Sequence, residues 1–119
     1  MTFEEIKALD HQYVMQSYGR FDVAVDHGRG ATLWDTQGRE YIDFTSGIGV
    51  CSLGYADEGW VNAITEQAGK LGHISNLFYA EPYVKAAEKL CRKAGMSNVF
   101  FANSGAESNE GLIKLARKY

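Results

Sequence analysis

The feature that most constrains this chain is an apolar run that leads through a tight turn directly into a helix. Residues 98–102 hold Val99, Phe100 and Phe101, and residues 103–106, Asn-Ser-Gly-Ala, follow at once. Beyond them, apolar residues keep helical spacing as far as Tyr119. A short run without polar alternation is typical of a strand buried on both faces of a parallel sheet. The order strand, turn, helix therefore predicts an α/β fold.

The turn at residues 104–106 has the properties of a phosphate-binding site. A helix N-terminus offers unpaired N–H groups and a positive partial charge. Gly105 lets the backbone approach an anion closely, and Ser104 adds a hydroxyl donor. A purely structural N-cap at Ser104 explains the same residues equally well. The chain contains neither the phosphate-loop nor the dinucleotide-binding glycine motif, so the turn is not of those two classes.

The residues before this unit predict three helices and an antiparallel β unit. Thr2 and Glu5 form a capping box for a helix that extends to about Ser17. Residues 22–44 read as short strands, with turns expected at 27–30 and 36–38. The Gly-rich residues 45–56 predict an irregular segment packed beneath a larger structure. Asp57 is expected to cap a helix that ends near Leu71.

A third helix is expected from Glu81 to the residue before Gly95. Pro82 fits its first turn, where a missing N–H is tolerated, and Gly95 provides a stop. The last helix, after residue 106, has no such stop signal, which predicts that further chain follows. The faces expected to be buried are Trp60, Val61, Ile64, Ala68 and Leu71 in one helix and Val84, Ala87, Leu90, Cys91 and Ala94 in the next.

Composition narrows the range of partners. The formal net charge is −3 and no Lys/Arg cluster occurs, which argues against nucleic acid. No apolar stretch approaches the ~20 residues of a membrane span, and the N-terminus lacks the pattern of a signal peptide. The two cysteines and three histidines show no metal-ligand spacing, so no metal is expected. These absences predict a cytoplasmic protein.

Several segments, in order, resemble the class III pyridoxal-phosphate (PLP) aminotransferases. Residues 34–44 are similar to the N-terminal hairpin of that family, and residues 103–119 to its phosphate-binding turn and helix. Residues 18–21 and 75–82 resemble the branch that acts on N-acetylornithine. The apolar Ile48, where ornithine-specific relatives carry tyrosine, favours the same branch. One departure is Gly54-Tyr55-Ala56-Asp57-Glu58, where the family usually shows Gly-His-x-His-Pro.

The resemblance implies the N-terminal part of a fold type I PLP-dependent transferase. Residues 1–50 would belong to a small domain, and residues 51–119 would begin a large domain with a mostly parallel sheet. PLP would be the cofactor, bound at a homodimer interface. The amides of Gly105 and Ala106, with Ser104 nearby, would hold its phosphate, and Tyr18 would line the substrate pocket.

The implied reaction passes the amino group of N-acetylornithine to 2-oxoglutarate, a step of arginine biosynthesis. No lysine here matches the family's cofactor-binding lysine, so no catalytic residue is assigned and the chain alone is expected to be inactive. Three alternatives remain open: an ornithine, succinylornithine or 4-aminobutyrate aminotransferase, a non-catalytic remnant, or a small binding module whose Ser104 turn is only a cap.

Overall fold

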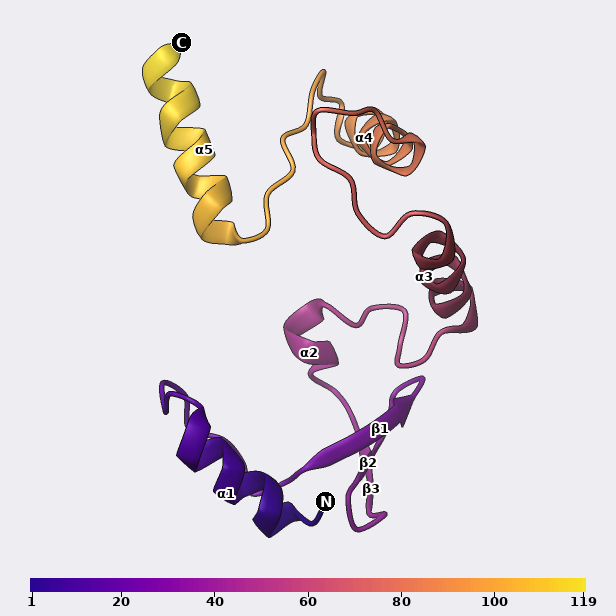
Figure 1. Cartoon of the computed structure of the whole chain (residues 1–119), viewed down its shortest axis with the longest axis vertical. Coiled ribbons are helices and arrows are strands. Elements are labelled where there is room, and N and C mark those ends of the chain that lie inside the picture. The colour runs from indigo at the N-terminus through magenta and orange to yellow at the C-terminus, as the bar shows by residue number, and fades with distance from the viewer. The chain divides into compact units, whose positions relative to one another are not determined.

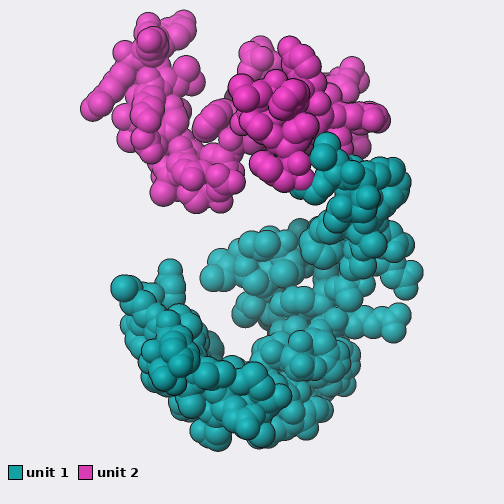
Figure 2. Space-filling view, in the orientation of Figure 1, with its two compact units in different colours: residues 1–72 teal, residues 73–119 magenta.

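The computed structural model describes residues 1–119 and contains five helices and three strands (Figure 1). In chain order they are α1 Phe3–Tyr13, β1 Val25–Arg29, β2 Thr32–Asp35, β3 Glu40–Ile42, α2 Ser46–Gly49, α3 Glu58–Lys70, α4 Glu81–Ala94 and α5 Gly105–Lys118. The chain divides into two compact units, Met1–Gly72 and His73–Tyr119, which are coloured separately in Figure 2. None of the helices is of the length and apolar character that crossing a membrane requires.

Helix α1 starts as predicted and ends early. The Thr2 N–H donates to Glu5 Oε2 at 2.8 Å, and the Glu5 N–H donates to Thr2 Oγ1 at 3.3 Å, which confirms the capping box. The helix was expected to reach Ser17 but stops at Tyr13, and Val14 is extended. The Gln16 side chain explains the early stop, because its amide donates to the Asp10 carbonyl at 3.0 Å and so caps the helix end.

The three strands form one antiparallel sheet in the order β1-β2-β3. Gly28 lies opposite Leu33 in the first pair, and Leu33 lies opposite Tyr41 in the second. The turn expected at residues 27–30 is misplaced, since β1 continues to Arg29 and the chain reverses at Gly30, where φ is +58°. Left-handed backbone at that position favours glycine, so the reversal falls there.

The sheet is fastened by the carboxylate of Asp35, the one residue in the chain that is buried. Asp35 Oδ1 accepts from the N–H groups of Gln37 and Arg39, both at 2.9 Å. Its Oδ2 accepts from Arg39 Nε at 2.8 Å and from the Tyr41 hydroxyl at 2.9 Å. Burial opposes the ionisation of Asp35, but these hydrogen bonds outweigh it and lower its pKa to about 2.

The Gly-rich segment after β3 is attached to the sheet through Tyr55. Tyr55 and Gly30 exchange two backbone hydrogen bonds, of 2.8 and 2.9 Å. The Tyr55 ring lies so close to Gly28 that a Cβ there would approach its Cγ to 2.7 Å. Within the segment, α2 is a left-handed turn, with φ of +59° at Gly47 and +62° at Ile48. The expected irregular segment therefore contains a short, ordered turn.

Helices α3 and α4 have the predicted caps. Asp57 Oδ1 accepts from the Trp60 N–H at 2.8 Å at the start of α3. Gly95 ends α4 in the left-handed conformation, with φ +65° and ψ +29°. The prediction of buried faces is wrong for both helices, because no residue of α3 or α4 is buried and no other element packs extensively against them. Trp60 is 56% exposed and Leu90 is 49% exposed.

The strand predicted over residues 98–102 is not formed. This segment makes no sheet hydrogen bonds and connects α4 to α5 without regular structure. A strand is defined by a paired neighbour, and the only sheet here is the β1-β2-β3 unit. The segment does contact both flanking helices: the Phe101 ring lies 4.9 Å from that of Tyr83, and Phe100 packs against Gly111.

A candidate anion-binding turn at the start of helix α5

The N-terminus of α5 is built by Ser104, which is its N-cap. Ser104 is extended, with φ −151° and ψ 161°, and its Oγ accepts from the Glu107 N–H at 3.2 Å. The Ser104 carbonyl accepts from the Ser108 N–H at 3.0 Å, the first hydrogen bond of the helix ladder. The structural role expected of Ser104 as a cap is therefore present, whether or not the turn also binds an anion.

Two N–H groups at this helix start make no hydrogen bond within the chain. They belong to Gly105 and Ala106, which precede the first residues with a partner in the helix or the cap. Together with the helix dipole, such amides attract an anion. Ser104, Gly105 and Ala106 lie on this one turn, and their role in binding a cofactor stays a prediction.

The surroundings of the turn leave room for a ligand. No atom lies within 4 Å of the position that a Cβ would take on Gly105, so the space above that backbone is open. Glu107 turns back, and its Oε2 accepts from the Asn103 N–H at 2.6 Å. That bond uses the carboxylate on the backbone before the cap and leaves the two amides uncovered. A phosphate such as that of PLP fits this donor set.

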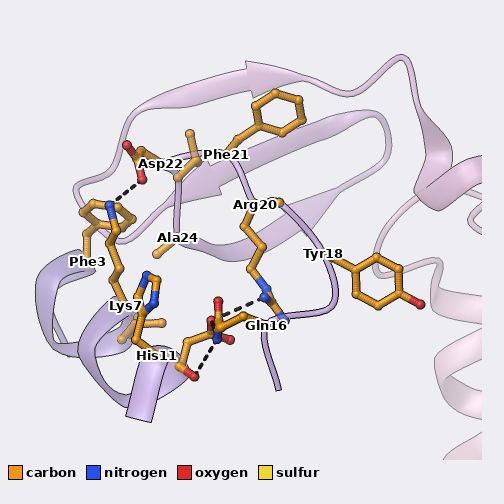
Figure 3. A pocket seen from close by; sticks show the side chains of 13 residues that line it. Phe3, Lys7, His11, Gln16, Tyr18, Arg20, Phe21, Asp22 and Ala24 are labelled. Atoms are coloured by element: carbon orange, nitrogen blue, oxygen red, sulfur yellow. Dashed lines mark hydrogen bonds and ion pairs between the residues drawn. The ribbon is translucent and has the colours of Figure 1, made fainter. Parts of the chain in front are cut away.

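Tyr18 belongs to the other compact unit, where it lines a cavity of about 420 Å³ beside α1. Two ion pairs border the cavity: Lys7 Nζ with Asp22 Oδ1 at 2.7 Å, and Arg20 with Asp10 Oδ2 at 3.3 Å. The Tyr18 ring extends away from these pairs and is 77% exposed (Figure 3). Its side chain is therefore available for contact with a ligand.

The lysines of the chain lie on helices, and most are engaged with carboxylates. Lys70, Lys85 and Lys114 each pair with a glutamate four residues earlier, and Lys7 pairs with Asp22. The hydrogen bond to Glu81 raises the pKa of Lys85, and that to Asp22 raises the pKa of Lys7. A reactive amine needs a lowered pKa, so neither Lys7 nor Lys85 is suited to bind a cofactor covalently. No group of three or more potential metal ligands is present.

A second polar cluster was not anticipated from the sequence. Asp43 Oδ2 accepts from the Tyr55 hydroxyl at 2.7 Å, while Oδ1 accepts from the Thr45 hydroxyl at 2.6 Å and the Thr45 N–H at 2.7 Å. The bond from the Thr45 side chain and then that from Tyr55 lower the pKa of Asp43 to about 2. The Asp-x-Thr spacing is a signal for the local bond, but nothing in the sequence indicates the bond to Tyr55.

Comparison with known proteins identifies the class. Residues 13–119 match the family model described as "Aminotransferase class-III". This match covers most of the chain, and the chain therefore belongs to the class-III aminotransferase family. The expectation of an N-terminal part of a PLP-dependent transferase fold is confirmed by the solved structures that it resembles.

Among individual relatives, the acetylornithine aminotransferase of Haemophilus ducreyi is 56% identical over the whole chain, which spans 30% of that relative's length. The crystal structure of acetylornithine aminotransferase from Elizabethkingia anophelis matches with a TM-score of 0.92 and 33% identity over 99% of this chain and 31% of that one. The ornithine aminotransferase of Toxoplasma gondii matches equally well, with a TM-score of 0.92 and 34% identity over 99% and 28%. Fold similarity alone does not separate the two activities.

Proposed function

We propose that this chain supplies the first part of a PLP-dependent aminotransferase that transfers the amino group of N-acetylornithine to 2-oxoglutarate. The observation that carries the cofactor assignment is the pair of unbonded amides, Gly105 and Ala106, at the start of α5. The choice of N-acetylornithine is supported by the 56% identity to an acetylornithine aminotransferase over all 119 residues. The chain spans only about 30% of such relatives, so the activity belongs to the whole protein.

In this proposal the chain's own residues anchor the phosphate of the cofactor and contact the substrate. The N–H groups of Gly105 and Ala106 donate to the phosphate, and the dipole of α5 stabilises its negative charge. Ser104 fixes the first turn of the helix through its Oγ, which accepts from the Glu107 N–H. Tyr18 presents an exposed phenol to the substrate. When bound, PLP supplies the electron sink that amino-group transfer requires.

The proposal extends to the architecture around the chain. Residues 1–50 are assigned to a small domain and residues 51–119 to the start of the PLP-binding large domain. On the same family reasoning, we propose that the complete protein is a homodimer. We also propose that it is cytoplasmic and acts in arginine biosynthesis.

The decisive experiment uses the complete protein. Amino transfer to 2-oxoglutarate is measured with N-acetylornithine, ornithine, N-succinylornithine and 4-aminobutyrate as donors. The highest kcat/KM is expected for N-acetylornithine, and a higher value for another donor would reassign the substrate. Ornithine is the leading competitor, because the Toxoplasma gondii enzyme shares the fold equally well.

The 119-residue chain provides a matched control. Incubated with PLP and borohydride and then weighed intact, it is expected to show no stoichiometric adduct on one lysine and no transfer activity. A single adduct at one defined lysine would show that the chain itself provides the covalent site.

A further inference from the structure

Helices α1 and α5 both carry a glutamate three residues after the N-cap, and the two glutamates bind different N–H groups. At the start of α1 the Glu5 carboxylate accepts from the N–H of the N-cap residue Thr2, at 2.8 Å. At the start of α5 the Glu107 carboxylate accepts instead from the N–H of Asn103, the residue before the N-cap, at 2.6 Å. The second bond therefore reaches one residue further back along the backbone than a standard capping box does.

Glu107 makes two hydrogen bonds that enclose the turn on which the cofactor phosphate is proposed to bind. Its N–H donates to Ser104 Oγ at 3.2 Å, and its Oε2 accepts from the Asn103 N–H. The residues that carry the proposed phosphate-binding amides, Gly105 and Ala106, lie between these points of attachment. The backbone and the side chain of one residue therefore close a ring across the turn.

The bond to Asn103 fixes how the chain enters α5. It joins a carboxylate to a backbone N–H, and bonds of this kind are shorter and roughly twice as strong as those between neutral groups. The N–H of Gly105 belongs to a planar peptide unit that lies between Asn103 and Glu107, the two residues that this bond connects. The direction of that N–H therefore depends on the bond, and so does the direction of the next amide, on Ala106.

The same bond determines where the negative charge of Glu107 lies. A carboxylate close to a bound phosphate repels it, and a carboxylate in the first turn of a helix also competes with a ligand for the unpaired amides. In α1, Glu5 occupies the amide of the N-cap residue in this way. In α5 the Asn103 N–H holds the Glu107 carboxylate on the backbone before the N-cap, so it does not occupy the amides of Gly105 and Ala106.

A glutamate in the first turn of a helix also complements the helix dipole, without any role in binding. That simpler account depends on the charge of Glu107 and not on the reach of its side chain. We propose instead that Glu107 is a positioning residue: by holding the Asn103 N–H, it orients the two phosphate-binding amides and keeps its own charge away from the phosphate. This inference rests on the proposed aminotransferase function, and it assigns Glu107 no contact with the reacting atoms.

The test titrates PLP into the complete protein after its cofactor has been removed, and it compares two variants of Glu107. Glu107→Gln keeps the length and an acceptor oxygen but removes the charge, whereas Glu107→Asp keeps the charge on a side chain too short to reach Asn103. Glu107→Asp is expected to raise the Kd for PLP roughly tenfold, the effect of losing one hydrogen bond to a charged group. Glu107→Gln is expected to stay within about threefold of wild type. The reverse order of the two variants would show that Glu107 serves only the helix dipole.

Two controls separate positioning of the phosphate from general damage to the helix. Glu110→Asp makes the same chemical change further along α5, where Glu110 is paired with Lys114. It is expected to leave the Kd for PLP within about twofold, because an exposed ion pair contributes little. Pyridoxal, which lacks the phosphate, should bind equally well to wild type and Glu107→Asp. Weaker binding of pyridoxal to Glu107→Asp, or an equal effect of Glu110→Asp on PLP, would overturn the positioning role.

Amide exchange gives a readout that does not depend on the cofactor. Exchange of the Asn103 N–H is expected to be faster in Glu107→Asp than in wild type and unchanged in Glu107→Gln, and equal exchange in all three would overturn the inference. A wild-type protein that does not bind PLP would remove the proposed function and this inference together. Equally tight binding of PLP by wild type and Glu107→Asp would overturn this inference alone. If Glu107→Asp does not fold, Glu107→Ala, which also cannot reach Asn103, must meet the same criteria.

Discussion

In the three-stranded sheet, several hydrogen bonds converge on one buried carboxylate, whereas the side-chain ion pairs of helices α4 and α5 each join two exposed residues four apart. Asp35 gathers four hydrogen bonds from three residues that follow it in the turn and on β3. Helix α4 instead carries i,i+4 ion pairs, such as Arg92 with Glu88 at 2.8 Å. Extensive contacts between elements occur only in the sheet, at β1·β2 and β2·β3.

This difference has a physical consequence for how each region responds to change. A buried carboxylate with several donors is a single point on which many bonds depend, and its loss leaves those donors without a partner. An exposed ion pair contributes little, because water and salt screen it. Loss of the Asp35 carboxylate should therefore destabilise the sheet strongly in one step. Loss of a single ion pair should weaken a helix only slightly.

The largest expected effect is that of Asp35→Asn. The amide nitrogen of the new side chain would face two other donors, the Nε–H of Arg39 and the hydroxyl of Tyr41. The hydrogen bonds that stabilise the sheet at this position would therefore be lost. Exchange of strand amides in the 119-residue chain should accelerate by at least about tenfold, while α4 amides stay unchanged. Asp26→Asn is the control, because Asp26 is an exposed carboxylate of the same sheet, paired only with His27. Equal effects of the two substitutions would remove the contrast between the regions.

The second-largest difference between the two regions is expected in their stability at low pH. The pKa values of Asp35 and Asp43 are both about 2 in the folded unit, below the ordinary value of 3.8. Because these values are depressed, the stability they contribute is present above pH 3.8 and is lost as the pH falls towards 2. Trp34 fluorescence in a Trp60→Phe background should change within that window. A transition above pH 5 would point to a different group.

A moderate effect is expected at the start of α5. Ser104→Ala removes the N-cap acceptor and should destabilise the helix by ~1 kcal/mol, whereas Ser104→Gly should do so by only a few tenths. Amide exchange at Glu107 and Ser108 measures this directly. Sheet amides should not respond, because the two sets of contacts are separate. A response in both regions would show that the turn is coupled to the sheet.

The smallest effect is expected on the surface of α4. Glu88→Gln removes the partner of Arg92 and should lower helix stability by ~0.3–0.5 kcal/mol at low salt, with the difference vanishing in high salt. Lys89→Gln is the control, since Lys89 forms no ion pair. Circular dichroism of the chain at two salt concentrations suffices. A salt-independent loss would attribute the effect to helix propensity instead.

The features predictable from the sequence are those that depend on neighbouring residues. The capping box at Thr2, the cap at Asp57 and the stop at Gly95 each involve atoms within a few residues, and all three are present. The turn at Ser104 was placed correctly for the same reason, although its role as a phosphate site remains a proposal. Local side-chain chemistry fixes these positions without reference to the rest of the fold.

The features that escaped prediction depend on partners distant in the sequence. Residues 98–102 have the composition of a strand, but pairing requires a neighbour that composition does not supply. The bond between Asp43 and Tyr55 spans a loop whose path depends on left-handed residues such as Ile48. Because a sequence pattern does not encode which aspartate a tyrosine reaches, this hydrogen bond could be found only in the three-dimensional structure.

The contact of the Tyr55 ring with Gly28 limits which substitutions these two positions can accept during evolution. A Cβ at position 28 would meet the Tyr55 ring at 2.7 Å and Leu33 at 2.8 Å, so substitution at that glycine is blocked while tyrosine stays at 55. The two positions are thus expected to be exchanged together: a smaller residue at 55 removes the ring contact, and the flexible end of Leu33 must also move to admit alanine at 28. Replacing only one of the two residues gives an intermediate that either has a steric clash at position 28 or lacks the hydrogen bond from Tyr55 to Asp43. A library that varies both sites at once should recover combinations that stepwise replacement cannot reach.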